Sequence, residues 1–445
     1  MSALPKIWVV LAAACLLLAA ASLRAQQTYV WTGATSGDWN TATNWNPNGV
    51  PGGSAVQGGN PEDVAEFDAS ARTAVSISAS VELGAISFAY GPPYSFQLNG
   101  WLQLRHGILN LSTTTQNTFT TSPGTLSFEQ DGDAANSLIT NNNGNLAFYG
   151  TSSAGSAQIT NNAGATIYFS NSSSGAGAVV YNGGTIDYSY MTAPSSLGAV
   201  AGGVDTQLLL GSQTLSIGAL NYTQTIDGSI LDGGFDGGSG GALTKVGSGI
   251  LQLTGTNGYT GKTTVAQGLL EVDSAVASPE VLVETGASVA GTGPINGSLA
   301  AQAGSTIFPG NVYNPSSSPP NTPLTVGKLF CAPSPTVFTR IGNVGSATHG
   351  NYLVLNSSLQ QGFCPHLHFS LASAGVPLSV GSYYLLILIQ GSTDYSAANI
   401  DFDFNYFAGY TQATGAITIA SLSSVTAIYL HLTDPGDRIF KSDFD

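Results

Sequence analysis

Two groups of acidic residues are the candidates in this sequence for the pair of carboxyl groups that sugar hydrolysis requires. The first group is Glu129, Asp131 and Asp133, and the second is Asp227, Asp232 and Asp236. Glycoside hydrolases work with two carboxyl groups held about 5–10 Å apart across a sugar-binding groove. Both groups lie among Gly, Asn and Ser, where acidic side chains ordinarily form solvated turns. We therefore predict that neither group is catalytic, with a glycan-cleaving enzyme as the alternative.

The second acidic group also bears on metal binding. Asp232-Gly-Gly-Phe-Asp236-Gly-Gly is similar to the Gly- and Asp-rich nonapeptide that binds calcium in β-rolls. Those calcium sites are built between successive copies of the motif, whereas this sequence has one irregular copy. We therefore expect no bound metal and no cofactor.

A second set of potential ligands lies further along the chain. Cys364-Pro-His366-Leu-His368 places three potential metal ligands on one face of an extended strand. Apart from Cys15 near the N-terminus, Cys331 and Cys364 are the only cysteines, and an even number in an exported protein favours one disulfide bond. We predict a Cys331–Cys364 disulfide, and two free thiols or half of a metal site are the alternatives.

The N-terminus indicates export. Lys6 precedes an apolar run from Ile7 to Ala21, and the small residue Ala25 follows a short polar segment. This pattern is typical of a secretory signal peptide, and the apolar run is shorter than the ~20 residues that a membrane-spanning helix needs. We predict a signal peptide over residues 1–25, a secreted or cell-surface location, and no membrane insertion of the remaining chain.

The composition limits the classes of fold and partner. Without Lys6 and Arg24 the chain has eight basic residues against 25 acidic ones, a net charge of −17. Nucleic-acid binding requires Lys and Arg to neutralise phosphates, so we exclude it. Hydrophobic residues make up 42% of the sequence, in short runs bounded by many of its 56 glycines, and stretches with helical periodicity are nearly absent. The sequence therefore predicts an all-β protein.

Internal repeats indicate how the strands are arranged. Residues 137–144 recur as residues 157–164, a shift of 20 positions. A fixed period near 20 in strand-forming sequence is the signature of a parallel β-solenoid, in which each coil buries its inward side chains against its neighbours. We therefore predict a right-handed parallel β-helix over residues 69–313, in which Ile139 stacks on Ile159.

Asparagine and tryptophan fit this architecture at its corners and at its end. Asn141, Asn161 and Asn182 lie at equivalent corners and are expected to form hydrogen-bonded ladders between coils. Large aromatic residues near the first coil could stack on sugar rings, but they more often close the open end of a solenoid. We predict this capping role for Trp31, Trp39, Trp45 and Trp101.

One segment, residues 241–272, carries a family motif. It contains Leu243-Thr-Lys245, alternating Gly and Leu from Gly247 to Leu253, Asn257-Gly-Tyr259-Thr-Gly261, and Gly268 to Val272. These residues resemble the autotransporter-associated β-strand repeat, and residues 281–311 resemble the coils that follow it in that family. The resemblance implies a passenger-type parallel β-helix. Classical members often carry a C-terminal outer-membrane barrel, but we find no series of amphipathic strands after Pro323 that would build one.

These observations combine into one organisation and one functional prediction. The expected segments are the signal peptide (1–25), a Trp-rich opening segment (26–68), the solenoid (69–313), a Pro/Ser-rich linker (314–325), a C-terminal β region (326–435) and a short tail (436–445). The C-terminal β region either continues the coil or closes it with an antiparallel cap. We predict a structural or adhesive, non-catalytic role, with surface glycans or other cell-surface proteins as partners. The alternative is a glycan-binding or glycan-cleaving β-helix with a pectate-lyase-like scaffold.

Overall fold

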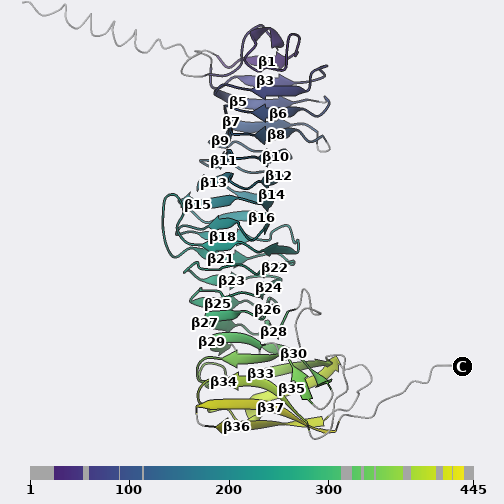
Figure 1. Cartoon of the computed structure of the whole chain (residues 1–445), viewed down its shortest axis with the longest axis vertical. Helices are drawn as coiled ribbons and strands as arrows, with labels where there is room; N and C mark the ends of the chain where they lie inside the picture. Colours follow the sequence, from purple (N-terminus) through teal and green to yellow (C-terminus); the bar gives the residue numbers. More distant parts are fainter. Residues whose placement is uncertain are drawn as a thin grey trace, which may run out of the picture.

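The protein is an elongated stack of parallel β-strands with about 12 turns (Figure 1). The computed structural model describes residues 25–53, 60–89, 91–112, 115–311, 323–331, 335–344, 347–373, 382–406, 414–422 and 424–434. Residues 1–24 of the predicted signal peptide, residues 314–322 of the predicted linker and the tail lie outside these ranges. Two 3-10 helices occur in this part of the chain, η1 (Ala42–Asn44) and η2 (Ala397–Asn399), and no helix there has the length and apolar character to cross a membrane.

Three ladders of parallel strands form the walls of the coil. The first ladder is β1 (Thr28–Trp31), β3 (Val64–Phe67), β5 (Val81–Phe88), β7 (Trp101–Asn110), β9 (Thr125–Phe128), β11 (Asn145–Phe148), β13 (Thr166–Asn171), β15 (Thr185–Met191), β17 (Gln207–Leu209) and β20 (Ser229–Leu231). The second is β4 (Ala74–Ile77), β6 (Ser95–Leu98), β8 (Thr118–Thr121), β10 (Leu138–Asn141), β12 (Gln158–Asn161), β14 (Gly175–Asn182), β16 (Ser195–Gly202), β18 (Thr214–Ile217), β21 (Ala242–Lys245), β23 (Thr263–Val265), β25 (Glu280–Val283), β27 (Pro294–Ala301), β29 (Pro323–Cys331), β32 (Tyr352–Leu355) and β34 (Tyr383–Ile389). The third begins on β16 and comprises β19 (Gln224–Ile226), β22 (Ile250–Leu253), β24 (Leu269–Val272), β26 (Ser288–Gly291), β28 (Thr306–Pro309), β30 (Thr336–Val344), β33 (Leu367–Ser373) and β35 (Ile400–Tyr406).

The 20-residue period sets the register between neighbouring coils. Ile139 on β10 pairs with Ile159 on β12, as predicted, and both side chains are buried. Along the first ladder the rings of Phe128, Phe148 and Phe169 stack with centroids 5.2 and 4.9 Å apart. Equivalent inward positions of successive coils therefore hold the same kind of residue, and each coil buries its apolar side chains against its neighbours.

The predicted asparagine ladder is present at one corner of the coil. The side-chain amide of Asn141 donates to Asn161, and that of Asn161 donates to Asn182, at 2.9 and 2.8 Å. All three side chains are buried, so these bonds satisfy groups that would otherwise lose their hydrogen bonds with water. At the same corner Asn143 has a φ of +53°, a left-handed conformation that asparagine tolerates better than most residues.

Three of the four tryptophans that were predicted to cap the solenoid close the N-terminal end of the coil. Trp31, Trp39 and Trp45 are buried, and the ring of Trp45 lies edge-on to both others at 5.0 and 4.7 Å. The short strand β2 (Trp45–Asn46) pairs with β1 in the antiparallel direction. The prediction is wrong for Trp101, because its side chain points outward from β7 and is 45% exposed.

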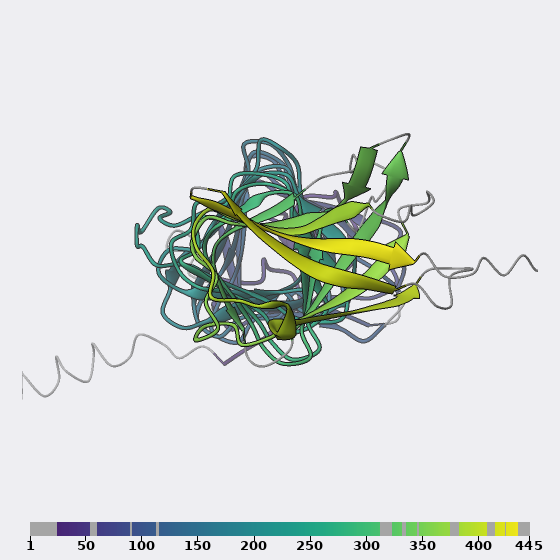
Figure 2. The ribbon, with the colours of Figure 1, turned by 90° about the horizontal axis from the view of Figure 1, so that it is seen from below.

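The C-terminal end combines the two arrangements that the sequence left open. Parallel pairing extends beyond the predicted 69–313 span and continues through β34 and β35. Two antiparallel strands, β36 (Thr414–Leu422) and β37 (Val425–Asp434), then pair with each other, and β37 pairs with β34. Viewed along the axis, these yellow strands lie across the end of the coil (Figure 2). A further strand, β31 (Ala347–Gly350), forms a hairpin with β30.

Candidate functional site

One member of the first acidic group lies beside basic residues of a neighbouring coil. Asp131, in the turn after β9, accepts from Nδ1 of His106 at 2.6 Å, and Glu62 contacts Nε2 of the same ring at 3.2 Å. The hydrogen bond to Asp131, followed by that to Glu62, raises the pKa of His106. The ring is 44% exposed, so this is a surface ion network that holds together three coils of the N-terminal half.

Arg105 extends the same network. Its guanidinium donates to Glu62 at 2.7 Å and also forms an ion pair with Glu82 of β5. Glu62 and Arg105 are 43 positions apart, so no local sequence pattern connects them. Asp133 is separate from this network, because its Oδ1 accepts from the backbone N–H of Ala135 and so stabilises its own turn.

The second acidic group is divided between two connections, with Asp227 between β19 and β20 and the other two aspartates between β20 and β21. Asp232 accepts from the backbone N–H groups of Gly241 and Thr260 at 2.9 and 3.1 Å, and therefore stabilises the turn before the repeat. Asp227 accepts from the hydroxyl of Thr254 in the next coil. The backbone N–H of Asp236 donates to Ser189. Within the described residues no group of three or more His, Cys, Asp or Glu side chains has the geometry of a metal site.

His366 and His368 meet two aspartates of the adjacent strand. His368 contacts Asp401 through Nδ1 at 2.8 Å and Asp403 through Nε2 at 2.9 Å, while His366 contacts Asp401 at 3.2 Å. Parallel pairing of β33 with β35 sets His368 opposite Asp401. Burial of the ring alone would lower the pKa of His368, but the hydrogen bonds to the two aspartates raise it above its ordinary value.

This arrangement predicts a pH-dependent stability of the C-terminal coils. A raised pKa in the folded chain means that the protonated His368 stabilises the fold at pH values below its unfolded pKa of about 6.5. That contribution is lost as the pH rises through the raised folded value. We expect His368→Gln to destabilise β33 and β35 by about 1–2 kcal/mol at pH 5.5 and by less at pH 8.5.

Hydrogen exchange of β33 and β35 in the wild type and the variant at both pH values measures this difference. His106→Gln is the matched control, because it removes another histidine that contacts two carboxylates but lies at the opposite end of the solenoid. An equal loss of protection in β33 at both pH values contradicts the prediction.

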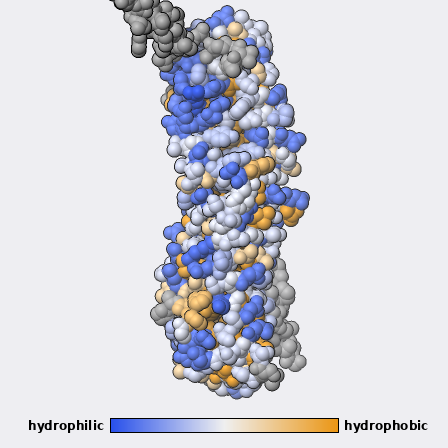
Figure 3. Space-filling view, turned by 90° about the vertical axis from the view of Figure 1, so that its left-hand side faces the viewer, coloured by the Kyte–Doolittle hydropathy of each residue, from blue (hydrophilic) through white to orange (hydrophobic). Residues whose placement is uncertain are grey.

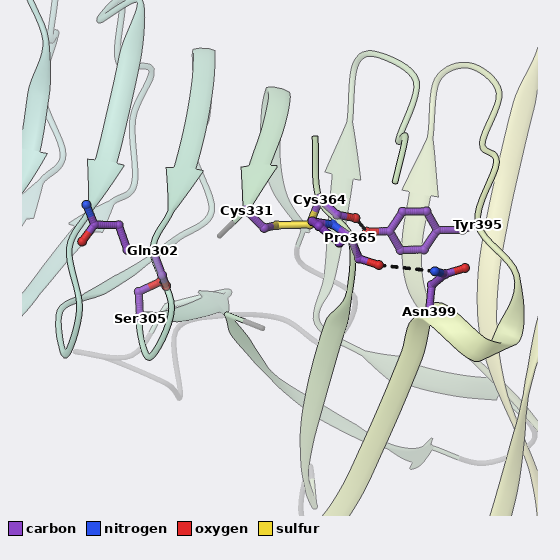
Figure 4. The surroundings of a disulfide bond; sticks show 7 residues. All are labelled: Gln302, Ser305, Cys331, Cys364, Pro365, Tyr395 and Asn399. Atoms are coloured by element: carbon purple, nitrogen blue, oxygen red, sulfur yellow. Dashed lines mark hydrogen bonds between the residues drawn. A yellow bond between two sulfur atoms is a disulfide. The ribbon is translucent and has the colours of Figure 1, made fainter. Parts of the chain in front are cut away.

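Cys331 and Cys364 form a disulfide bond between β29 and the turn before β33 (Figure 4). Their Cα atoms lie 4.4 Å apart, and Cys364 is buried. The cysteine therefore does not serve as a metal ligand beside His366 in this structure. Tyr395 donates to the backbone carbonyl of Cys364, and Asn399 donates to that of Pro365, so the next coil is fastened to the same turn.

A polar groove of about 520 Å³ lies over the outer side of the asparagine corner. Four strands contribute to it, β12, β14, β16 and β19. Its lining is Thr160, Asn161, Asn162, Tyr181, Asn182, Gly183, Ala201, Gly202, Gly203, Thr223, Gln224, Thr225 and Asp227. Asp227 is the single ionisable carboxyl group among these residues, so the groove lacks the pair of carboxyl groups that glycoside hydrolysis uses. Its hydroxyl, amide and phenol groups are suited to binding a polar ligand.

The motif residues of the segment 241–272 have structural roles. Lys245 occupies an inward position of β21 and is fully buried, and its ammonium group donates to the backbone carbonyls of Val246, Gly247 and Gln267 at 2.7, 2.8 and 3.2 Å. Burial lowers the pKa of Lys245 to about 8, so it is still mostly protonated at pH 7. The buried hydroxyl of Tyr259 bonds to Thr263 at 2.7 Å, which fixes the turn before β23.

Comparison with known proteins gives two matches. Residues 243–272 match the family model of the passenger-associated transport repeat. A curated relative, the extracellular serine protease of Serratia marcescens, is 45% identical over 71 residues, which are 16% of this chain and 7% of that protein. The chain thus spans a small part of the length of this relative. The matched residues 243–272 include the buried Lys245 and Tyr259, which organise the turns around β21 to β24. The chain is thus a parallel β-helix protein in which residues 243–272 match the passenger-associated transport repeat.

Proposed function

We propose that this chain is an exported, non-catalytic β-helix with a structural or adhesive role. The supporting observation is that Asp131, Asp133 and Asp232, three of the acidic residues that could have been catalytic, are engaged in an ion network or a turn. A general acid or base must instead be free to exchange a proton with a substrate held in a cleft. These three aspartates stabilise the scaffold.

The serine protease relative raises the question of a catalytic triad. In a triad, the serine hydroxyl donates to a histidine whose other ring nitrogen is held by a carboxylate. His106 and His368 each use both ring nitrogens for carboxylates. Ser370, close to His368, donates to Asp403 instead. These contacts favour a shared scaffold with the relative over a shared protease activity.

Glycan contact is the form of adhesion that the polar groove supports. Its lining of Asn, Thr and Gly, with the exposed ring of Tyr181 at one side, supplies hydrogen-bond donors and acceptors together with an apolar surface. A solenoid repeats weak contacts along its length, and many such contacts on one cell or matrix surface add up to useful avidity. Other cell-surface proteins are the second class of partner that we propose.

We predict that removing the acidic groups abolishes no turnover and, Asp232 apart, has little effect on any glycan binding. In the variant Asp131→Asn, Asp133→Asn and Asp236→Asn, affinity for array glycans should stay within about threefold of the wild type. Asp232 is replaced singly, because its carboxylate accepts from the backbone N–H groups of Gly241 and Thr260 and its loss alters that turn. A glycan array, a reducing-end release assay and labelling with a fluorophosphonate serine probe test this together. Cleavage of a polysaccharide that falls about 100-fold or more in one of the single variants would replace this proposal with an enzyme, because that is the scale of a lost general acid or base.

A further inference from the structure

The connection between β20 and β21, residues 232–241, folds back over an earlier coil (Figure 1). Its tip lies against β15, which precedes β20 by about forty residues in the sequence. Asp187 on β15 faces outward, yet its side chain is fully buried because this connection covers it. The chain could pass from β20 to β21 without a loop that reaches back to β15. The position of this loop therefore indicates a role beyond connecting the two strands.

The tip of the loop is fixed by hydrogen bonds to β15. The carboxylate of Asp187 accepts from the backbone N–H of Ser189 at 2.7 Å through Oδ1 and from that of Phe235 at 2.9 Å through Oδ2. The hydroxyl of Ser189 accepts from the backbone N–H of Asp236 at 3.0 Å. Two consecutive backbone groups of the loop are thus held by buried partners on β15.

The rest of the loop is equally constrained. Gly234 has a φ of +127°, and a Cβ added there would lie 2.5 Å from Oδ1 of Asp187. At the base, Asp232 accepts from the backbone N–H groups of Gly240 and Gly241. The loop is therefore held at its base and at its tip, and Phe235 is presented in a defined position.

Phe235 extends an aromatic surface over the first ladder. It is 64% exposed, although its ring centroid lies 5.6 Å from that of Tyr168 on β13. Tyr190 on β15 lies 6.3 Å from Tyr168, and both rings are close enough to Tyr149 to act on its pKa. In the space-filling view of this side, hydrophobic residues lie at the surface at mid-height, surrounded by hydrophilic ones (Figure 3). We call the rings of Tyr149, Tyr168, Tyr190 and Phe235 the aromatic platform.

We propose that the aromatic platform binds neutral pyranose oligosaccharides. One face of a pyranose ring consists of C–H groups that pack on an aromatic ring, while its hydroxyl groups need donors and acceptors at the rim. Phenol groups supply these at the platform, as does the carboxylate of Glu129, which is close enough to Tyr149 to raise the pKa of that phenol. The net charge of −15 repels anionic sugars. Because the loop is fixed before the ligand arrives, binding loses little further conformational entropy.

The inference rests on the proposed glycan contact, but it concerns a different face from the polar groove. The groove lies over β12, β14, β16 and β19, whereas the platform lies over β11, β13 and β15 of the first ladder. The two sites can therefore be tested independently by substitution.

The experiment titrates the full chain with cellohexaose, mannohexaose and galactohexaose by calorimetry. At least one neutral hexasaccharide should bind, and Phe235→Ala or Tyr190→Ala should weaken it by about tenfold or more. Phe235→Trp should retain the affinity within about threefold and change its fluorescence on binding. Phe363→Ala is the matched control, since Phe363 is an exposed phenylalanine, 51% exposed, that also packs edge-on against another ring. Its affinity should equal that of the wild type.

Asp187→Asn tests the positioning role of the loop. It retains one acceptor oxygen but places an amide N–H₂ against a backbone N–H, so the tip of the loop should be released and the affinity should fall as in Phe235→Ala. Hydrogen exchange of β13 and β15 must remain protected in this variant, which separates loop release from unfolding.

Three outcomes overturn the inference. If the wild type binds a hexasaccharide and the platform variants bind it equally well, the platform is not the site, while the proposed glycan contact survives. If the wild type binds neither a neutral hexasaccharide nor hexagalacturonate, the glycan contact fails as well. In the third outcome neutral sugars do not bind, but hexagalacturonate or polylysine does, and Phe235→Ala weakens that binding about tenfold or more. The platform then recognises an acidic glycan in the case of hexagalacturonate, or a basic protein segment in the case of polylysine.

Discussion

Lys245→Met is expected to destabilise the coils around the repeat by about 2–4 kcal/mol. Methionine fills nearly the same apolar space but leaves the carbonyl groups of Val246, Gly247 and Gln267 without the ammonium donor. Each buried acceptor left without a partner costs about 1–3 kcal/mol. Removing the buried positive charge is favourable and offsets part of this total cost. Urea unfolding, together with hydrogen exchange of β21 to β24, measures the loss.

Lys262→Met is the control for this substitution. Lys262 lies in the same repeat but at the surface, where its Nζ contacts Glu280 at 2.6 Å and both side chains are 40% exposed or more. An exposed pair of this kind contributes less than about 1 kcal/mol. If both lysine variants lose the same small amount of stability, the lysine of the family motif has no special structural role.

Loss of the Cys331–Cys364 disulfide is expected to destabilise the C-terminal coils by about 3–4 kcal/mol. The bond closes a loop across 33 sequence positions, so removing it increases the conformational entropy of the unfolded chain. We expect the double variant Cys331→Ala and Cys364→Ala to lose protection from hydrogen exchange in β29 to β35. Thiol titration of the denatured, unreduced wild type should find no free sulfhydryl among these two cysteines.

The effect should be confined to one part of the molecule. Coils of a solenoid contact their immediate neighbours, so β10 to β16 should retain their protection when the disulfide is removed. A reducing agent should reproduce the loss in the wild type and have no further effect on the double variant. Equal stability of the reduced and oxidised wild type would contradict the prediction.

The solenoid architecture follows from the sequence because its contacts are between near neighbours. A shift of 20 residues between equivalent segments places Ile139 on Ile159 and Asn141 on Asn161 with no further information. The same local logic identified the repeat over residues 241–272, whose turn residues and alternating hydrophobic positions are contiguous in the chain. The pairing of Cys331 with Cys364 required no more than a count of cysteines in an exported protein.

The candidate sites are formed by residues in turns and loops of unequal length. The 20-residue period therefore does not predict which of these residues meet. Glu62 reaches His106 from 44 positions away, and Phe235 lies over Tyr168 because a glycine-rich loop returns to an earlier coil. The prediction for Trp101 rested on residue type and failed, because Leu102 and Leu104 of β7 point inward and the alternation of a strand then places Trp101 on the outer face. The sequence thus determined the repeating scaffold, whose contacts are local and periodic. Tertiary structure alone decided which side chains meet on its outer faces, because those contacts join turns of unequal length across several coils.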